Sequence, residues 1–202
     1  MFLIDTRAAG VDRLQKEDAK MKYLAPCLAL VLLATPAVAQ SVGEKTGINS
    51  TLGISPATED FVKQAAMSDI FEIQSSQLAQ ERGNAAEKSF AANMIKDHAK
   101  TTSELKSMVS GGELKATLPT ELDSTHQSKI DKLKSLRGAD FSSRYNIEQV
   151  SGHKDAISLF ERYAKGGDHP KLKEWADKVL PTLRHHHEMA LGLAAGKTVG
   201  KH

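Results

Sequence analysis

The sequence is poor in cysteine, in aromatic residues and in charge of one sign, and each shortage excludes a class of protein. The only cysteine of the 202 residues is Cys27, so neither an intramolecular disulfide nor a multi-cysteine metal site can form. Aromatic residues make up 5% of the chain, too few for base-stacking platforms, and the net charge is only +2. A nucleic-acid partner is therefore not expected. The chain is 40% hydrophobic, which suffices for a packed core.

A long apolar run is missing as well, and the short one near the N-terminus has another explanation. It covers residues 24–33, whereas a membrane span needs about 20 apolar residues. Met21 and Lys22 precede the run, and the small-x-small sequence that ends at Ala39 follows it. This order is typical of a secretory signal peptide over residues 21–39, with cleavage near Ala39. We therefore expect a periplasmic or secreted protein without a membrane span.

The residues on either side of the signal peptide are predicted to lie outside the folded domain. Residues 1–20 carry charges of both signs, unlike a signal peptide, and are interpreted as an upstream extension. The true start, Met1 or Met21, is left open. Residues 40–54 are rich in Gly, Ser and Thr and are predicted to be a flexible leader, and residues 197–202 a tail.

Residues 55–196 are predicted to form one all-α domain. Its helices are marked by Ser55-Pro56 at a start, by a capping box of Asn84 and Glu87, and by glycines after helix ends. These signals predict four long helices and a short one, over residues 55–82, 84–110, 121–137, 140–165 and 168–195.

The apolar stripes of the long helices step by three and four residues, as in a left-handed bundle. The short third helix can carry the chain along the bundle between two antiparallel pairs. The sequence therefore predicts a ferritin-like four-helix bundle with an additional short crossover helix. A homo-oligomer stays open, and no protein partner is indicated.

Three of the stripes place a histidine where a leucine would be expected: His98, His153 and His186. Glu72 lies on the apolar face of the first helix, within about 40° of its core positions. Four side chains from four helices are therefore predicted to meet inside the bundle. Imidazole and carboxylate suit one transition-metal ion, such as zinc, iron, copper or manganese. Asp97 and Asp155 are candidate outer partners of the imidazoles.

Two other functions compete with a metal site. A buried Glu–His hydrogen-bond network would make the protein a metal-free structural or envelope-stress interaction protein. A weaker alternative is an oxidase-like enzyme, but the Glu-x-x-His motif of di-iron bundles is missing, since Ile95, Val150 and Leu183 stand three residues before the histidines. No catalytic residue is assigned, and a role other than catalysis is favoured. In His185-His186-His187, one inward histidine with two outward neighbours is expected.

Five segments of the chain also resemble a bacterial family called domain of unknown function 4142, which often carries the label of an outer membrane protein. They read FVKQAA, FEI, FAANMIKDH, HKDAISLFE and LPTLRHH, at residues 61–66, 71–73, 90–98, 153–161 and 180–186. The resemblance spans about residues 57–194. It implies a secreted, ferritin-like helical bundle, and it brings no established activity. Recurrent polar positions of that family correspond to Glu72, Asp97, His98, His153 and His186.

Overall fold

The computed structural model describes residues 47–196, and these residues form an all-helical structure. The upstream extension, the signal peptide, residues 40–46 of the leader and the tail predicted at residues 197–202 lie outside the described residues. Within residues 47–196 there are six helices and no strand. They are α2 (Ile48–Leu52), α3 (Thr58–Arg82), α4 (Ala85–Ser110), α5 (Ser124–Ser135), α6 (Gly138–Gly166) and α7 (Pro170–Ala194).

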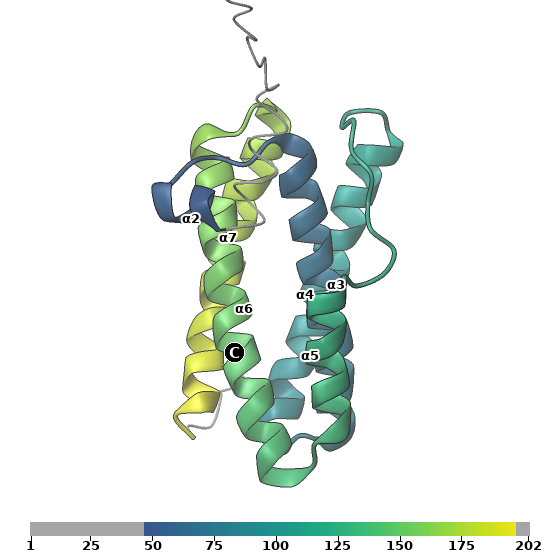
Figure 1. The fold of residues 1–202 in the computed structure, drawn as a ribbon, viewed down its shortest axis with the longest axis vertical. Coiled ribbons are helices and arrows are strands. Elements are labelled where there is room, and N and C mark those ends of the chain that lie inside the picture. Colours follow the sequence, from purple (N-terminus) through teal and green to yellow (C-terminus); the bar gives the residue numbers. More distant parts are fainter. Residues whose placement is uncertain (1–46, 197–202) are drawn as a thin grey trace, which may run out of the picture. The chain divides into compact units, whose positions relative to one another are not determined.

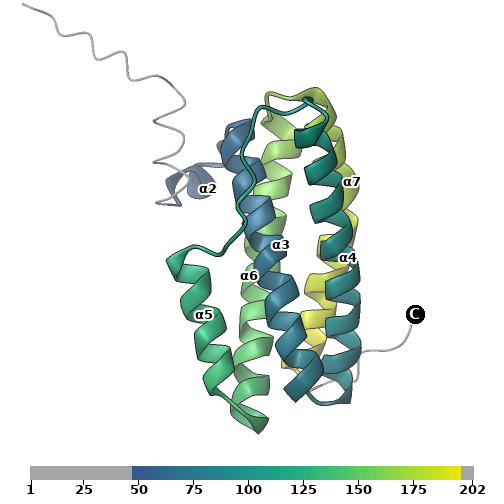
Figure 2. The same cartoon turned by 90° about the vertical axis from the view of Figure 1, so that its right-hand side faces the viewer.

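The four long helices form a bundle of two tightly packed pairs. α3 packs against α4, and α6 packs against α7, while the contacts between the pairs are less extensive. Figure 1 shows the two pairs side by side, each running antiparallel. The connection after α4 crosses the bundle and leads into α5, which lies along α3 and α6 (Figure 2). The predicted four long helices and short crossover helix are therefore present.

Local sequence explains where most helices begin. The capping box predicted at Asn84 is formed, with its side chain accepting from the Glu87 amide and Glu87 accepting from the Asn84 amide. Asp123 caps α5 through the His126 amide, so this helix begins at Ser124 rather than at residue 121. At α7 the cap is the ring of His169, which accepts from the Leu172 amide ahead of the expected Pro170.

Two further helix boundaries differ from the predicted ones, and the predicted leader contains a helix. α3 begins at Thr58 because Ser55 does not cap it; the Ser55 hydroxyl donates to the Pro56 carbonyl instead. Gly138 does not end the short helix but opens α6, with a positive φ of 53° that suits glycine. The leader predicted to be flexible over residues 40–54 contains a helical turn, α2, between two further positive-φ glycines.

The core consists of two apolar clusters with a polar layer between them. On each long helix the two clusters occupy different halves, for example Phe61 and Leu78 on α3. Between these halves lie buried polar side chains from all four helices, which we call the polar layer: Asp69, Glu72, Ser75, His98, Gln149, His153 and His186. Because the helices are antiparallel, residues at very different sequence positions reach the same level.

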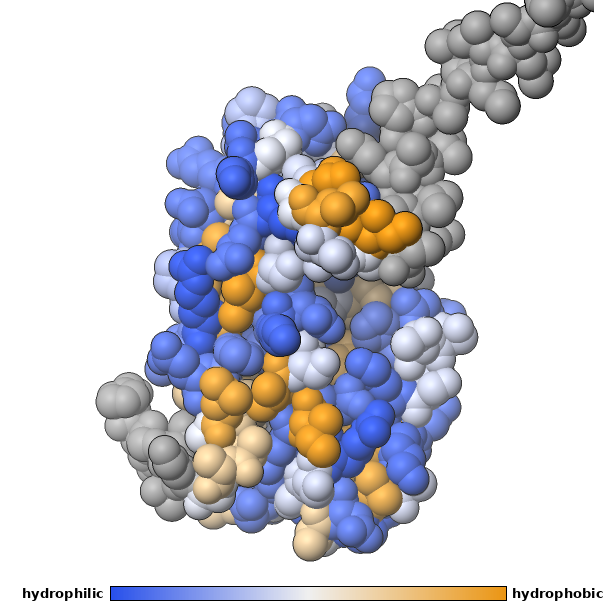
Figure 3. All heavy atoms as spheres, turned by 60° about the vertical axis from the view of Figure 1, so that its left-hand side comes forward, coloured by the Kyte–Doolittle hydropathy of each residue, from blue (hydrophilic) through white to orange (hydrophobic). Residues whose placement is uncertain are grey.

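The surface is mostly hydrophilic, with apolar patches separated by polar side chains on the face that Figure 3 shows. The large apolar side chains with the greatest exposure among residues 47–196 are Ile48, Leu52 and Ile54 around α2, Ile147 on α6 and Leu191 on α7. In the part of the chain that the structure describes, no helix combines the length and apolar character required to cross a membrane.

Candidate metal centre

The three histidines predicted to share a site do lie together in the polar layer. Their ring centroids are 5.7 Å apart for His98 and His153, 5.5 Å for His98 and His186, and 5.4 Å for His153 and His186. All three are buried, with exposed fractions of 4%, 1% and 1%. One nitrogen from each ring falls within 4.8 Å of one nitrogen from each of the others.

Each ring is held in place by a hydrogen bond at one nitrogen. His98 Nδ1 donates to Asp69 Oδ1 at 2.8 Å. His153 Nδ1 donates to the Gln149 carbonyl at 2.8 Å, one turn back along α6. His186 Nε2 donates to Asp97 Oδ2 at 3.1 Å across α4 and α7. Two carboxylates and one carbonyl therefore fix the orientation of the rings, and these are the usual outer partners of metal-bound histidines.

The second nitrogen of each ring lacks a hydrogen-bond partner in the part of the chain that the structure describes. His98 Nε2, His153 Nε2 and His186 Nδ1 are buried and have no hydrogen-bond partner among the described residues. A neutral imidazole that donates from one nitrogen carries a lone pair on the other. Each buried, unpartnered polar atom costs roughly 1–3 kcal/mol of folding free energy. The three rings that carry these atoms lie with centroids 5.4–5.7 Å apart, so one ligand could be shared among them.

The electrostatics of the cluster lower the pKa of two rings and raise the pKa of the third. Burial lowers the pKa of His186 to about 4, helped by the charge on His98. Burial also holds the pKa of His153 well below its usual value. For His98, burial would lower the pKa, but the hydrogen bond and negative charge of Asp69 outweigh it and raise the pKa above the ordinary 6.5. Asp69 therefore favours the protonated form of His98, in which the two side chains would form a buried ion pair.

Glu72 is also in the polar layer, as predicted, but on the other side of His153. Its Oε1 lies 4.0 Å from His153 Nδ1, which already donates to the Gln149 carbonyl. The group within 4.8 Å comprises the three imidazoles without Glu72. Glu72 is 1% exposed, its Oε2 has no partner within residues 47–196, and burial raises its pKa to about 7. This carboxyl group is consequently a neighbour of the cluster, and near pH 7 both its neutral and its charged form are populated.

The outer partners predicted from the sequence are partly wrong. Asp97 is a partner, but of His186 instead of the adjacent His98, because neighbouring helical residues point about 100° apart. Asp155 is exposed and lines a surface pocket; it does not contact His153 in any described interaction. The partner of His98 is Asp69, which the sequence analysis missed, although it lies three residues before Glu72 and hence on the same face of α3.

Asp69 anchors more than one side chain. Its carboxylate accepts from Thr101 Oγ1 at 2.9 and 2.8 Å and from Thr102 Oγ1 at 3.0 Å, in addition to His98.

In the His185–His187 tract only His186 is buried, as expected, while His185 is exposed and His187 is half-buried.

The fold and this site define an all-helical bundle with three convergent imidazoles in its core. Residues 43–193 match the family described as a domain of unknown function (DUF4142), and the chain belongs to this family. Comparison with curated proteins gives no match, and comparison with solved structures gives none either.

Proposed function

We propose that this protein binds a single transition-metal ion through His98, His153 and His186. The proposal rests on the two nitrogens of each ring. One nitrogen of every ring donates a hydrogen bond to an outer partner, and the other nitrogen is buried without a hydrogen-bond partner among the described residues. A purely structural network would be expected to satisfy those atoms within the protein. Once His98 has lost any second ring proton, one cation can accept the lone pairs of all three nitrogens at once.

The donor set favours zinc, copper, iron or manganese. Neutral imidazole suits these metals, whereas magnesium and calcium prefer oxygen ligands. A tetrahedral zinc ion with Zn–N bonds of about 2.0–2.1 Å requires ligand nitrogens roughly 3.4 Å apart. From separations of up to 4.8 Å, a modest inward rotation of the rings achieves this. Glu72 is our candidate for a fourth ligand, because it has a buried carboxylate oxygen to offer.

A metal-free network is the second candidate function, and the Asp69–His98 ion pair favours it. A protonated His98 carries a hydrogen on both nitrogens and can donate from Nε2 to a neighbouring neutral imidazole. The cluster would then fix the register of the helices without an ion, and the protein would act as a structural or interaction protein of the cell envelope.

Two further proposals concern the setting of the site. The paired long helices and the crossover through α5 support a ferritin-like bundle. The signal-like residues 21–39 support a periplasmic or secreted protein. Neither proposal assigns a catalytic activity.

Metal analysis of protein purified without a polyhistidine tag separates the two candidate functions. We expect about one ion per chain in the wild type and none in a His98→Ala/His186→Ala double variant. The matched control is His185→Ala/His187→Ala, which removes the two outward imidazoles of the same tract and is expected to keep the ion. Wild-type protein that holds no metal, and whose melting temperature does not change with zinc, copper or iron, would establish the metal-free network.

A further inference from the structure

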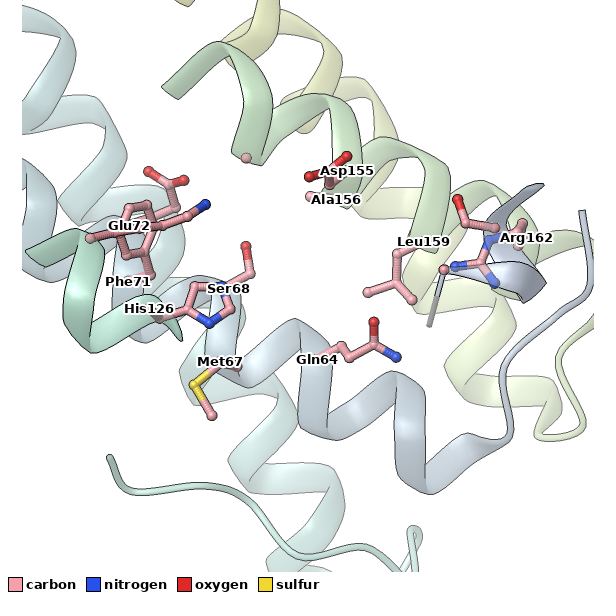
Figure 4. A pocket seen from close by; sticks show the side chains of 14 residues that line it. Gln64, Met67, Ser68, Phe71, Glu72, His126, Asp155, Ala156, Leu159 and Arg162 are labelled. Carbon is pink, nitrogen blue, oxygen red and sulfur yellow. The ribbon is translucent and has the colours of Figure 1, made fainter. Parts of the chain in front are cut away.

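A pocket of about 480 Å³ opens on the side of the bundle where α2, α5, α3 and α6 meet. Its lining includes Ser68 and Glu72 from α3, Lys129 from α5, and Gly152 and Asp155 from α6. Figure 4 shows Glu72 with Phe71 and His126 at one end, and Leu159 with Arg162 at the other. The pocket therefore runs from solvent to a residue of the polar layer.

Glu72 belongs both to this pocket and to the surroundings of the histidines. Its side chain lines the pocket, and its Oε1 is 4.0 Å from the ring of His153. Its Oε2 is buried and finds no hydrogen-bond partner in the described part of the chain. Glu72 thus adjoins both the pocket and His153, so a cation bound to its carboxylate would lie beside the histidine cluster.

Gly152 leaves the room that Glu72 occupies. A Cβ atom at this position would lie 2.9 Å from Glu72 Oε1, closer than any normal contact. Glycine inside a helix costs roughly 0.5–1 kcal/mol relative to alanine, so its presence in α6 has a spatial rather than a conformational explanation. The close approach of α6 to the Glu72 carboxylate depends on it.

The charges along the pocket are compatible with a cation. Asp155 is exposed at the pocket and Glu72 lies at its inner end. The positive charge of Lys129 is partly offset by an ion pair with Glu148 at 2.9 Å, a carboxylate that also pairs with Arg144. Arg162 also lines the pocket and donates to the Ile54 carbonyl at 2.6 Å.

We propose that this pocket is the path by which a divalent transition-metal cation reaches the histidine cluster, with Glu72 as the ligand that receives the ion and transfers it to the imidazoles. The inference rests on the proposed function. Transfer involves only ligand exchange: the ion exchanges pocket water for a Glu72 oxygen and then gains the three imidazole nitrogens. A competing path leads past Asp97, whose side chain is 31% exposed beside His186.

The kinetics of cobalt(II) uptake by the full chain test the path, with the visible absorption of bound Co²⁺ as the readout. Ser68→Phe fills the pocket one turn from Glu72 without replacing a proposed ligand, and we expect uptake to slow by about tenfold or more, with unchanged stoichiometry. The matched control is Ser151→Phe, an exposed serine on α6 outside the pocket lining, which should take up cobalt at the wild-type rate. Glu72→Gln is also expected to slow uptake.

If Ser68→Phe does not fold, Ser68→Cys in a Cys27→Ser background offers a reversible block. Modification of the folded protein with a bulky methanethiosulfonate should slow uptake, and reduction should restore it. Uptake at the wild-type rate in the blocked protein would overturn the proposed path, while the metal site itself would stand. A wild-type protein that binds no cobalt would overturn the metal site and the path together.

Discussion

Replacing Asp69 by asparagine should weaken metal binding although Asp69 itself is not proposed to touch the ion. The change keeps the shape of the side chain but removes the negative charge that faces His98 Nδ1 at 2.8 Å. A carboxylate at this position strengthens the imidazole as a ligand and fixes the orientation of its ring. Loss of such an outer partner typically costs about 10–100-fold in metal affinity, or roughly 1.4–2.7 kcal/mol.

The measurement is a zinc competition titration against a chromophoric chelator at pH 8. Asp69 raises the pKa of His98 against the opposing effect of burial, so Asp69→Asn lowers that pKa and eases proton loss, an effect that would favour binding in acid. Work at pH 8 removes most of this competition and leaves the loss of ligand strength.

The same substitution also affects folding, so it needs a control. Asp69 accepts from both threonine hydroxyls of α4, and we expect Asp69→Asn to reduce the free energy of unfolding by about 1–3 kcal/mol while the helical circular dichroism is kept. Asp177→Asn, an exposed aspartate on α7, should change neither property. A dissociation constant of folded Asp69→Asn equal to that of the wild type would refute the outer-partner role of Asp69.

Three more predictions follow from burial and charge. In the metal-free protein, the folded-state pKa of Glu72 is raised by burial from 4.5 to about 7, so the folded state holds a proton that the unfolded state has lost. The free energy of unfolding should therefore fall as the pH rises from 4.5 to 7, by up to roughly 3 kcal/mol for this group. Between pH 4.5 and 7, the difference in unfolding free energy between wild type and Glu72→Gln should shrink or reverse. Zinc binding near pH 6.5 should release on the order of one to two protons, because the pKa of His98 is raised and that of Glu72, the candidate fourth ligand, is raised to about 7, while the pKa values of the other two rings are lowered. Calorimetry in buffers of different ionisation enthalpy measures this release, and zero release would contradict the raised pKa of both groups. Finally, Phe61→Ala should lower the free energy of unfolding by about 3–5 kcal/mol, since Phe61 is fully buried and stacks on Tyr163 with centroids 4.0 Å apart; denaturant unfolding tests it, and a loss below 1 kcal/mol would show that this end of the core is loosely packed.

Periodicity predicted the positions of the inward histidines because a straight helix has a fixed angle per residue. In α7 the stripe from Leu172 through His186 to Leu193 is buried at every predicted position. In α6, residues spaced by three and four from His153 are buried less regularly. Phe160 is buried, but Val150, Ile157 and Ala164 are only half-buried, while Gln149 beside the stripe is buried. That the three rings share one level follows from antiparallel packing, which the short loops between paired helices favour.

Partners across helices could not be read from the sequence in the same way. Asp97 and His186 are 89 residues apart, and their hydrogen bond depends on the rotation of α4 relative to α7. Sequence proximity wrongly suggested that Asp97 serves His98. The pocket beside Glu72 depends on the distance between α3 and α6, which Gly152 allows but does not by itself predict.

The most direct test of the account is X-ray absorption at the metal edge of untagged protein loaded with one equivalent of zinc. The arrangement of His98, His153 and His186 predicts three imidazole nitrogens at about 2.0 Å, with a scattering pattern that disappears in the His98→Ala/His186→Ala variant and persists in His185→Ala/His187→Ala. A spectrum of oxygen ligands only, or one that is lost in the second variant and kept in the first, would contradict a metal site in the core of the bundle.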